Sequence, residues 1–308
     1  MIRTQDAAAM VRRVRTNVAG WRPGTAGWSA LVAICVLAGC GCAASGGAST
    51  TSATSQVTRA GPVTATGRPS PHRSAVQSGP PSGKLLAGKI VGIDPGHNGL
   101  NHADPAFLGQ IIWNGREKEG CDTTGTQTAS GYSEALFNFA VATDLAAQLR
   151  QQGASVVLTR RNNNGVGPCV DRRSRIIDAA HANVAIDIHA DGGPTWGRGF
   201  TVLEPIADGY NNKVIASSFR FGRYVHAAFL SYTPMRVANY YGHDGYIARD
   251  DLAGLNLTTV PKVLIECGNM PNAADAALLT SPSVQRQIAR ALDAAIVRFL
   301  TGHWPPRG

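Results

Sequence analysis

The segment Lys89-Ile90-Val91-Gly92-Ile93-Asp94-Pro95-Gly96-His97 decides the fold. A short apolar run that ends in Pro-Gly is typical of a buried strand followed by a tight turn. Two more apolar runs, at 184–188 and 263–265, are followed directly by a histidine and a glutamate. We therefore expect three buried strands, each leading into a side chain that can bind a metal or move a proton.

Helical periodicity separates these strands. Apolar residues four apart over 133–150 predict an amphipathic helix, and Gly153 is a natural stop after it. We expect further strands at 156–158 and 200–203, and further helices at 171–182, 211–230 and 283–300. This alternation predicts one α/β domain with a mostly parallel central sheet and helices on both faces. The polar, Gly-rich stretch 99–131 interrupts the rhythm, so we expect an inserted hairpin or long loop near the mouth of the site.

The charge of the chain does not indicate a nucleic-acid partner. The 308 residues include 29 Lys and Arg against 20 Asp and Glu, a formal net charge of +9. Five basic residues precede Cys40 and only Asp6 opposes them, so the remainder carries +5. This part has no Lys/Arg block and no aromatic RNA-binding motif, and attraction to another anionic polymer or surface fits equally well.

The N-terminal residues 1–40 have the layout of an export signal. A basic segment up to residue 22 precedes an apolar run at 26–39. Leu37-Ala38-Gly39-Cys40 resembles a bacterial lipobox, which predicts a lipidated Cys40 and attachment to the outer face of the membrane. An ordinary cleaved signal and an uncleaved anchor are the alternatives. All three predict an exported protein of the cell envelope.

Residues 41–83 differ in composition from the rest of the chain. They are rich in Ala, Ser, Thr, Gly and Pro and contain no acidic residue. Such a sequence cannot bury enough surface to offset the entropy of ordering, so we expect a flexible tether. The folded domain is then expected at 84–303, with a tail at 304–308.

Four side chains are predicted to meet at one edge of the sheet. Ligands of open α/β sheets lie at the carboxyl ends of the strands, which His97, His189 and Glu266 follow. Glu134 lies on the buried face of its helix and needs a cation or donors there. Two histidines and one glutamate form a ligand set of catalytic zinc, and Glu266 is then left as a general base.

Structural roles for the same residues remain open at this point. His97 could cap a helix, His189 could be a hydrogen-bonded core histidine, and Glu134 could be an N-terminal helix acid favoured by the dipole. In the metal-site interpretation, Asp94 and Asp187 are close enough in sequence to accept hydrogen bonds from the ligating imidazoles.

Four motifs then point to a family. They are Asp-Pro-Gly-His-Asn-Gly at 94–99, Ser-Glu at 133–134, Ile-His-Ala-Asp at 188–191 and Leu-Ile-Glu-Cys-Gly-Asn at 264–269. In this order they resemble the zinc-dependent N-acetylmuramoyl-L-alanine amidases of the amidase_3 type, over about residues 86–301. The resemblance implies the α/β fold of that type, which is phosphorylase/hydrolase-like.

The resemblance also implies an activity and a role for each site residue. One zinc per chain would be held by His97, Glu134 and His189, with Glu266 as the catalytic acid/base. The substrate would be peptidoglycan or muropeptides, cut at the amide between N-acetylmuramic acid and L-alanine, in wall remodelling or cell separation. The alternatives are a zinc peptidase acting on wall peptides and a non-catalytic wall-binding lipoprotein.

Further residues resemble a single-domain branch of this family with a cysteine-bearing hairpin. Cys121 and Cys169 match its disulfide pair, with two free thiols as the alternative, and Cys267 is expected to be a small buried residue. Asp191 adds negative charge near the proposed zinc. Arg249 lies in a loop that resembles the one beside the substrate, where it would pair with a stem-peptide carboxylate or with Asp250 or Asp251.

Overall fold

The computed structural model describes residues 84–305 of the chain. The predicted export signal with Cys40, the tether at 41–83 and the last three residues lie outside the described residues. Within the described part, no helix has both the length and the hydropathy needed to cross a bilayer.

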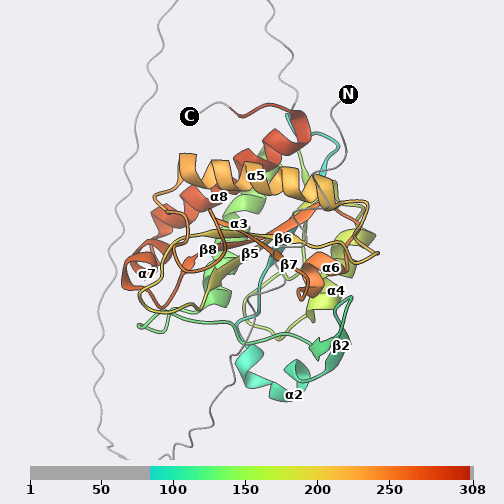
Figure 1. The fold of residues 1–308 in the computed structure, drawn as a ribbon. Helices are drawn as coiled ribbons and strands as arrows, with labels where there is room; N and C mark the ends of the chain where they lie inside the picture. The colour runs from blue at the N-terminus through green and yellow to red at the C-terminus, as the bar shows by residue number, and fades with distance from the viewer. Residues whose placement is uncertain (1–83, 306–308) are drawn as a thin grey trace, which may run out of the picture. The chain divides into compact units, whose positions relative to one another are not determined.

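The centre of the domain is a six-stranded sheet with the order β4-β1-β5-β8-β6-β7 (Figure 1). Its strands are β1 (Ile90–Pro95), β4 (Ser155–Leu158), β5 (Val184–Asp191), β6 (Thr201–Pro205), β7 (Tyr246–Arg249) and β8 (Lys262–Asn269). The first four strands in spatial order are parallel, β6 runs antiparallel to β8, and β7 is parallel to β6. The predicted mostly parallel sheet is confirmed.

Helices cover both faces of the sheet, as predicted. One face carries α3 (Glu134–Gln151) and α5 (Ile215–Tyr232), with α8 (Pro282–Thr301) packed against both. The other face carries α4 (Val170–Ala179) and the short α6 (Ala253–Asn256). Figure 1 shows α5 and α8 above the sheet and α4 and α6 below it.

The alternation of side chains along β5 explains why both faces are covered. Val184, Ile186 and Ile188 belong to the large core that includes α3 and α8. Ala185 points the other way and packs with Ile177 of α4. A strand that is apolar on both faces is stable only between two layers of helices, so the apolar sequence of β5 requires this three-layer arrangement.

The start of α3 is set locally. The Ser133 hydroxyl accepts a hydrogen bond from the Leu136 amide at 3.3 Å, which caps the helix. Glu134 is thereby the first helical residue, and the helix runs to Gln151. Gly153 follows with a φ of +94°, a left-handed conformation that favours glycine. The predicted helix at 133–150 is therefore confirmed within one residue at each end.

The stretch 99–131 forms an insertion that contains a short hairpin, as predicted. It consists of a 3₁₀ turn (Asn101–Ala103), α2 (Pro105–Leu108), β2 (Ile111–Trp113) and β3 (Lys118–Gly120). The hairpin lies below the sheet in Figure 1. Outside this insertion, three short elements of the described residues have no counterpart among the predicted ones: β7, α6 and α7 (Ala273–Leu279).

Candidate functional site

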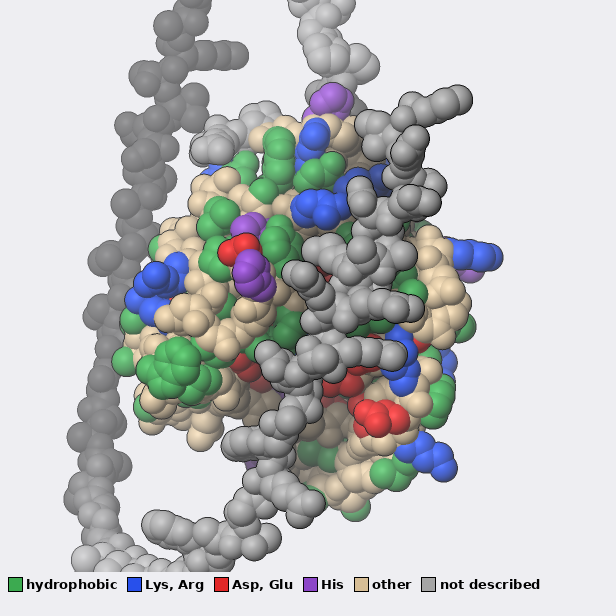
Figure 2. All heavy atoms as spheres, in the orientation of Figure 1, with side chains coloured by type: hydrophobic (Ala, Val, Ile, Leu, Met, Phe, Trp, Pro, Cys, Tyr) green, Lys and Arg blue, Asp and Glu red, His purple; other side chains and the backbone are tan. Residues whose placement is uncertain are grey.

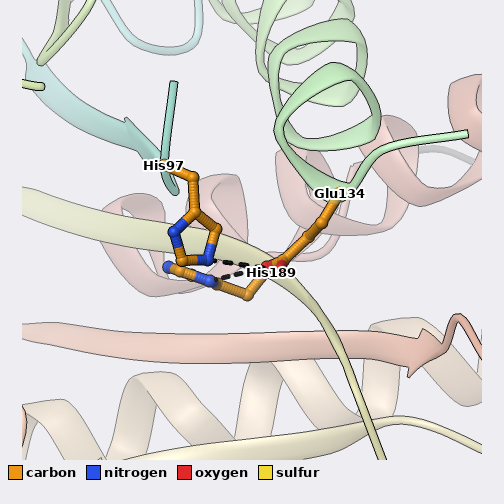
Figure 3. Close-up of side chains that lie close together, drawn as sticks. All are labelled: His97, Glu134 and His189. Atoms are coloured by element: carbon orange, nitrogen blue, oxygen red, sulfur yellow. Dashed lines mark hydrogen bonds and ion pairs between the residues drawn. The ribbon is translucent and has the colours of Figure 1, made fainter. Parts of the chain in front are cut away.

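His97, Glu134 and His189 converge on one point (Figure 3). His97 lies in the loop after β1, Glu134 is the first residue of α3, and His189 lies near the end of β5. The Glu134 carboxylate is 3.2 Å from Nε2 of His97 through Oε2 and 2.9 Å from Nδ1 of His189 through Oε1. One nitrogen of each ring and one carboxylate oxygen lie within 4.8 Å of one another, an arrangement that can hold a metal ion.

The close approach of the two histidines depends on Gly96. A Cβ at that position would lie 2.2 Å from Cε1 and 2.3 Å from Nε2 of His189. His97 itself has a φ of +56°, a conformation that a histidine adopts only at some cost. The loop after β1 is thus shaped so that the two imidazole rings, 5.0 Å apart between centroids, meet edge to face.

The surroundings of Glu134 favour its ionised form. Its oxygens accept hydrogen bonds from the amides of Thr126 (3.0 Å) and Ala190 (3.2 Å) and from Nδ2 of Asn138 (3.3 Å). Burial alone would raise the pKa of Glu134, but the charge of His97 and the hydrogen bond from His189 hold it well below its usual value. A buried carboxylate that stays ionised suits a cation ligand.

The electrostatics at His97 point the same way. Burial works to lower the pKa of His97, yet Glu134 and Asp122 raise it to about 10. The site therefore attracts positive charge strongly enough to keep a proton on a buried imidazole. A divalent metal ion bound by the same three side chains would benefit from the same potential, so the residues fit a metal chemically as well as geometrically.

Glu266 lies beside this cluster because of strand register. Glu266 of β8 is the direct partner of His189 in the parallel β5–β8 pair. Within the described residues, its buried Oε2 has no hydrogen-bond partner. Burial and the charges of Glu134 and Asp191 raise the pKa of Glu266 well above its usual value. A carboxyl group whose pKa is raised in this way holds a proton more readily than an ordinary glutamate, which suits a general acid/base.

Two adjoining cavities open on the cluster, and both include His97 and His189 in their walls. One, of about 330 Å³, contains Glu266 and Arg249. The other, of about 290 Å³, lies between the β3 end of the hairpin and residues 251–254. The predicted insertion near the mouth of the site therefore does line the cleft. In Figure 2, most of the acidic side chains on the face drawn lie in its lower half, whereas Lys and Arg lie at several separate places.

The predicted role of Asp94 and Asp187 is wrong. Within residues 84–305 neither carboxylate hydrogen-bonds to His97 or His189. Asp94 instead accepts hydrogen bonds from Arg173 (2.9 Å) and from Thr159, and Asp187 lies 2.7 Å from Nζ of Lys262. Because Arg173 and Lys262 are buried cations, they need these carboxylates as partners and draw them away from the imidazoles.

Asp122, and not Asp94, is the carboxylate that contacts the imidazole of His97. Its Oδ1 is 3.1 Å from Nδ1 of His97. It follows Cys121, which forms a disulfide with Cys169 at the start of α4, so the predicted disulfide is confirmed. The position of Asp122 directly after that cysteine is the only signal by which the sequence could have indicated it.

Asp191 and Arg249 both line the cavity that contains Glu266. Asp191 accepts a hydrogen bond from the Tyr240 hydroxyl at 2.7 Å. Arg249 donates to Asp251 through Nε at 2.7 Å and also to the Tyr241 hydroxyl. We expected Arg249 to pair with a stem-peptide carboxylate or with Asp250 or Asp251, and in the structure it pairs with Asp251.

Cys267 is fully buried, and burial raises the pKa of its thiol well above the usual value. A thiol in this state does not form the thiolate that nucleophilic catalysis requires. Cys267 is therefore the small buried residue that we expected and not a nucleophile.

Comparisons with known proteins agree with this geometry. A curated N-acetylmuramoyl-L-alanine amidase of Mycobacterium tuberculosis, Rv3717, is 41% identical over 216 residues, which cover 70% of this chain and 88% of that protein. The crystal structure of the amidase Ami1 from Mycobacterium smegmatis matches with a TM-score of 0.67 and 37% identity, over 71% of this chain and 99% of that one. Ami1 from Mycobacterium abscessus matches with a TM-score of 0.66 and 38% identity, over 70% of this chain and 100% of that one.

The family match covers the described site. The model of the Amidase_3 family, described as N-acetylmuramoyl-L-alanine amidase, matches residues 91–298. This range contains both histidines of the cluster, Glu134, Glu266 and the cysteine-bearing insertion. With the fold, the cluster and the cleft in agreement, the chain belongs to the Amidase_3 family of N-acetylmuramoyl-L-alanine amidases.

Proposed function

We propose that this protein is a zinc-dependent hydrolase that cleaves the amide between N-acetylmuramic acid and L-alanine in peptidoglycan. The observation that carries the proposal is the convergence of His97, Glu134 and His189 beside Glu266 in an open cleft. Membership of the Amidase_3 family supplies the reaction class. Two imidazoles and one carboxylate are a common protein ligand set of catalytic zinc and leave a position open.

The residues of the site have two separate roles, metal binding and proton transfer. His97, Glu134 and His189 would hold the zinc, which when bound supplies a Lewis acid that activates water and polarises a carbonyl. Glu266 would accept the proton of the attacking water through its unpaired Oε2 and pass it to the departing L-alanine nitrogen. The raised pKa of Glu266 supports both halves of this transfer, because the group must first gain and then release a proton.

Arg249 is the residue best placed to bind the stem peptide. It lines the same cavity as Glu266, and Asp251 and Tyr241 fix its guanidinium. A guanidinium held in this way loses little freedom when it pairs with a carboxylate of the substrate. We infer a role for Arg249 in binding the peptide.

The proposal extends to the cellular setting. We infer an exported protein that acts in wall remodelling or cell separation, attached to the outer face of the membrane through a lipidated Cys40 or else secreted. The Cys121–Cys169 disulfide supports export, because such bonds persist in oxidising compartments. The mass of the mature N-terminal peptide would distinguish lipidation of Cys40 from plain cleavage.

Mass spectrometry of muramyl peptides treated with the zinc-loaded protein tests the activity. Release of a free peptide that begins with L-alanine is the expected result. Cleavage inside the peptide would indicate a zinc peptidase instead, and no cleavage despite bound zinc would indicate a wall-binding protein.

A variant of Glu266 tests its assigned role. Glu266→Gln should retain zinc and lose about 10²- to 10⁴-fold in turnover. Glu204→Gln is a matched control, because burial also raises the pKa of Glu204, to about 7, while Glu204 lines neither cavity that opens on the cluster. Equal activity of the Glu266→Gln variant and the unmodified protein would refute the assignment.

A further inference from the structure

We propose that Asp122 and Arg173 form a positioning pair that holds His97 in its metal-binding conformation. The proposal rests on the metal-dependent function given above and adds two residues to it. Both lie outside the three-residue cluster and outside the motifs that indicated the family. The inserted segment, which supplies Asp122, would then be part of the metal site as well as a wall of the cleft.

The pair contacts His97 at both its ring and its backbone. One oxygen of Asp122, Oδ1, is 3.1 Å from Nδ1 of the imidazole. The other, Oδ2, accepts a hydrogen bond from Nη2 of Arg173 at 3.2 Å. The same Nη2 donates to the backbone carbonyl of His97 at 2.9 Å. One guanidinium nitrogen of Arg173 therefore binds both the carboxylate that contacts the imidazole and the backbone carbonyl of the histidine. Both side chains of the pair are nearly inaccessible to solvent.

The conformation of His97 requires such support. Its φ of +56° lies in the left-handed region, which is unfavourable for a residue other than glycine. Two buried arginines hold the loop in this shape. Arg173 also donates to the carbonyl of Pro95 at 2.8 Å, and Arg160 donates to the carbonyls of Pro95 at 2.8 Å and Gly96 at 3.2 Å. Three consecutive carbonyls, at 95–97, are thus bound by guanidinium groups.

The contacts also decide which ring nitrogen of His97 is directed toward Glu134 and is available to a metal ion. Nδ1 faces two acceptors, the Asp122 carboxylate at 3.1 Å and the Thr123 carbonyl at 3.2 Å. Nε2 faces the Glu134 carboxylate at 3.2 Å, so both ring nitrogens have an acceptor, and a metal ion that takes the place of the proton on Nε2 leaves the proton on Nδ1, held by its two acceptors. Asp122 thereby selects the tautomer that can bind the metal together with Glu134 and His189.

The covalent structure keeps the pair together. Asp122 directly follows Cys121, and the disulfide joins Cys121 to Cys169, the N-cap residue of α4. Arg173 lies one turn into that helix. The backbone amide of Val170 also donates to the Cys121 carbonyl at 2.9 Å. The insertion and α4 are therefore fixed to each other directly beside the Asp122–Arg173 contact.

Zinc affinity, measured by competition with a chelator of known affinity, tests the proposal. Asp122→Ala should bind zinc about 10- to 100-fold more weakly, the usual effect of removing a group that orients a ligating histidine. Asp122→Asn should lose less, because the amide oxygen can still accept from Nδ1 while the negative charge is gone. Asp104→Asn is the control, because Asp104 lies in the same insertion and only caps α2.

A second measurement separates positioning from general stability. In the zinc-loaded protein, nitrogen NMR should show His97 protonated at Nδ1 and bound through Nε2, and Asp122→Ala should show loss or mixing of that state. Zinc affinity of Asp122→Ala within twofold of the unmodified protein, with an unchanged tautomer, would overturn the positioning role. The proposed function has its own test, because zinc binding and muramyl-peptide cleavage by the unmodified protein do not depend on this comparison.

Discussion

The fit between Gly96 and the ring of His189 leads to a sharp prediction for Gly96→Ala. The added Cβ would lie 2.2 Å from Cε1, 2.3 Å from Nε2 and 2.7 Å from Nδ1 of His189, whereas ordinary van der Waals contact begins at 3.4 Å. The ring must therefore move by about 1 Å, well beyond the roughly 0.2 Å within which metal–ligand distances are fixed. The φ of Gly96 is outside the left-handed region, so the collision and not backbone strain determines the effect.

We expect Gly96→Ala to lose about 100-fold or more in amidase activity, since a misplacement of this size typically has that effect. Isothermal titration with zinc and hydrolysis of a muramyl peptide would measure binding and activity on the same sample. Gly88→Ala is the control. Gly88 has a φ of +73°, so Gly88→Ala should be less stable than the unmodified protein by about 1 kcal/mol. There is open space around its Cβ position, so zinc affinity should not change. Zinc affinity of Gly96→Ala within threefold of the unmodified protein would refute the reasoning.

Three further predictions concern stability and can be checked by chemical or thermal unfolding. Burial raises the pKa of Asp293 from 3.8 to about 6, so its ionisation opposes folding increasingly as the pH rises from about 4 to 6. Asp293→Asn should therefore be about 3 kcal/mol more stable than the unmodified protein at pH 7 and equal to it at pH 3, and a difference that does not change with pH would contradict this. Lys262→Met removes the cation 2.7 Å from Asp187 and should cost about 3–5 kcal/mol at neutral pH, whereas adding Asp187→Asn should restore part of the loss. Replacing both Cys121 and Cys169 by serine opens a link between residues 48 apart and should cost about 2–4 kcal/mol; an unchanged unfolding midpoint would mean that hydrogen bonds alone hold the insertion.

Local patterns were sufficient to predict most of the sheet and its long helices. The apolar runs of β1, β5 and β8 are buried between helices on both faces, so burial imposes a pattern that the sequence displays directly. The elements β7, α6 and α7 are only four to seven residues long, too short for a period to be visible. The antiparallel direction of β6 was also not predictable, because the pattern of a strand does not record which way it runs.

In the site, too, local patterns predict some features, whereas others depend on tertiary packing. His97, His189 and Glu266 each follow an apolar run, and parallel strands bring their carboxyl ends to one edge. The partners of Asp94 and Asp187 depend on Arg173 and Lys262, which are distant in sequence and become neighbours only when α4 and β8 pack against the sheet. Sequence proximity to a histidine was therefore a poor guide to which carboxylate would touch it.

The direct pairing of His189 with Glu266 across two adjacent strands has a consequence for how such enzymes diverge. The spacing between these two side chains is set by backbone hydrogen bonds of the sheet and not by the chain that connects them. Loops between residues 192 and 261 can thus lengthen, shorten or be exchanged while the two groups keep their distance. Substrate preference can change through these loops over evolution, or be redesigned in the laboratory, without rebuilding the reacting centre.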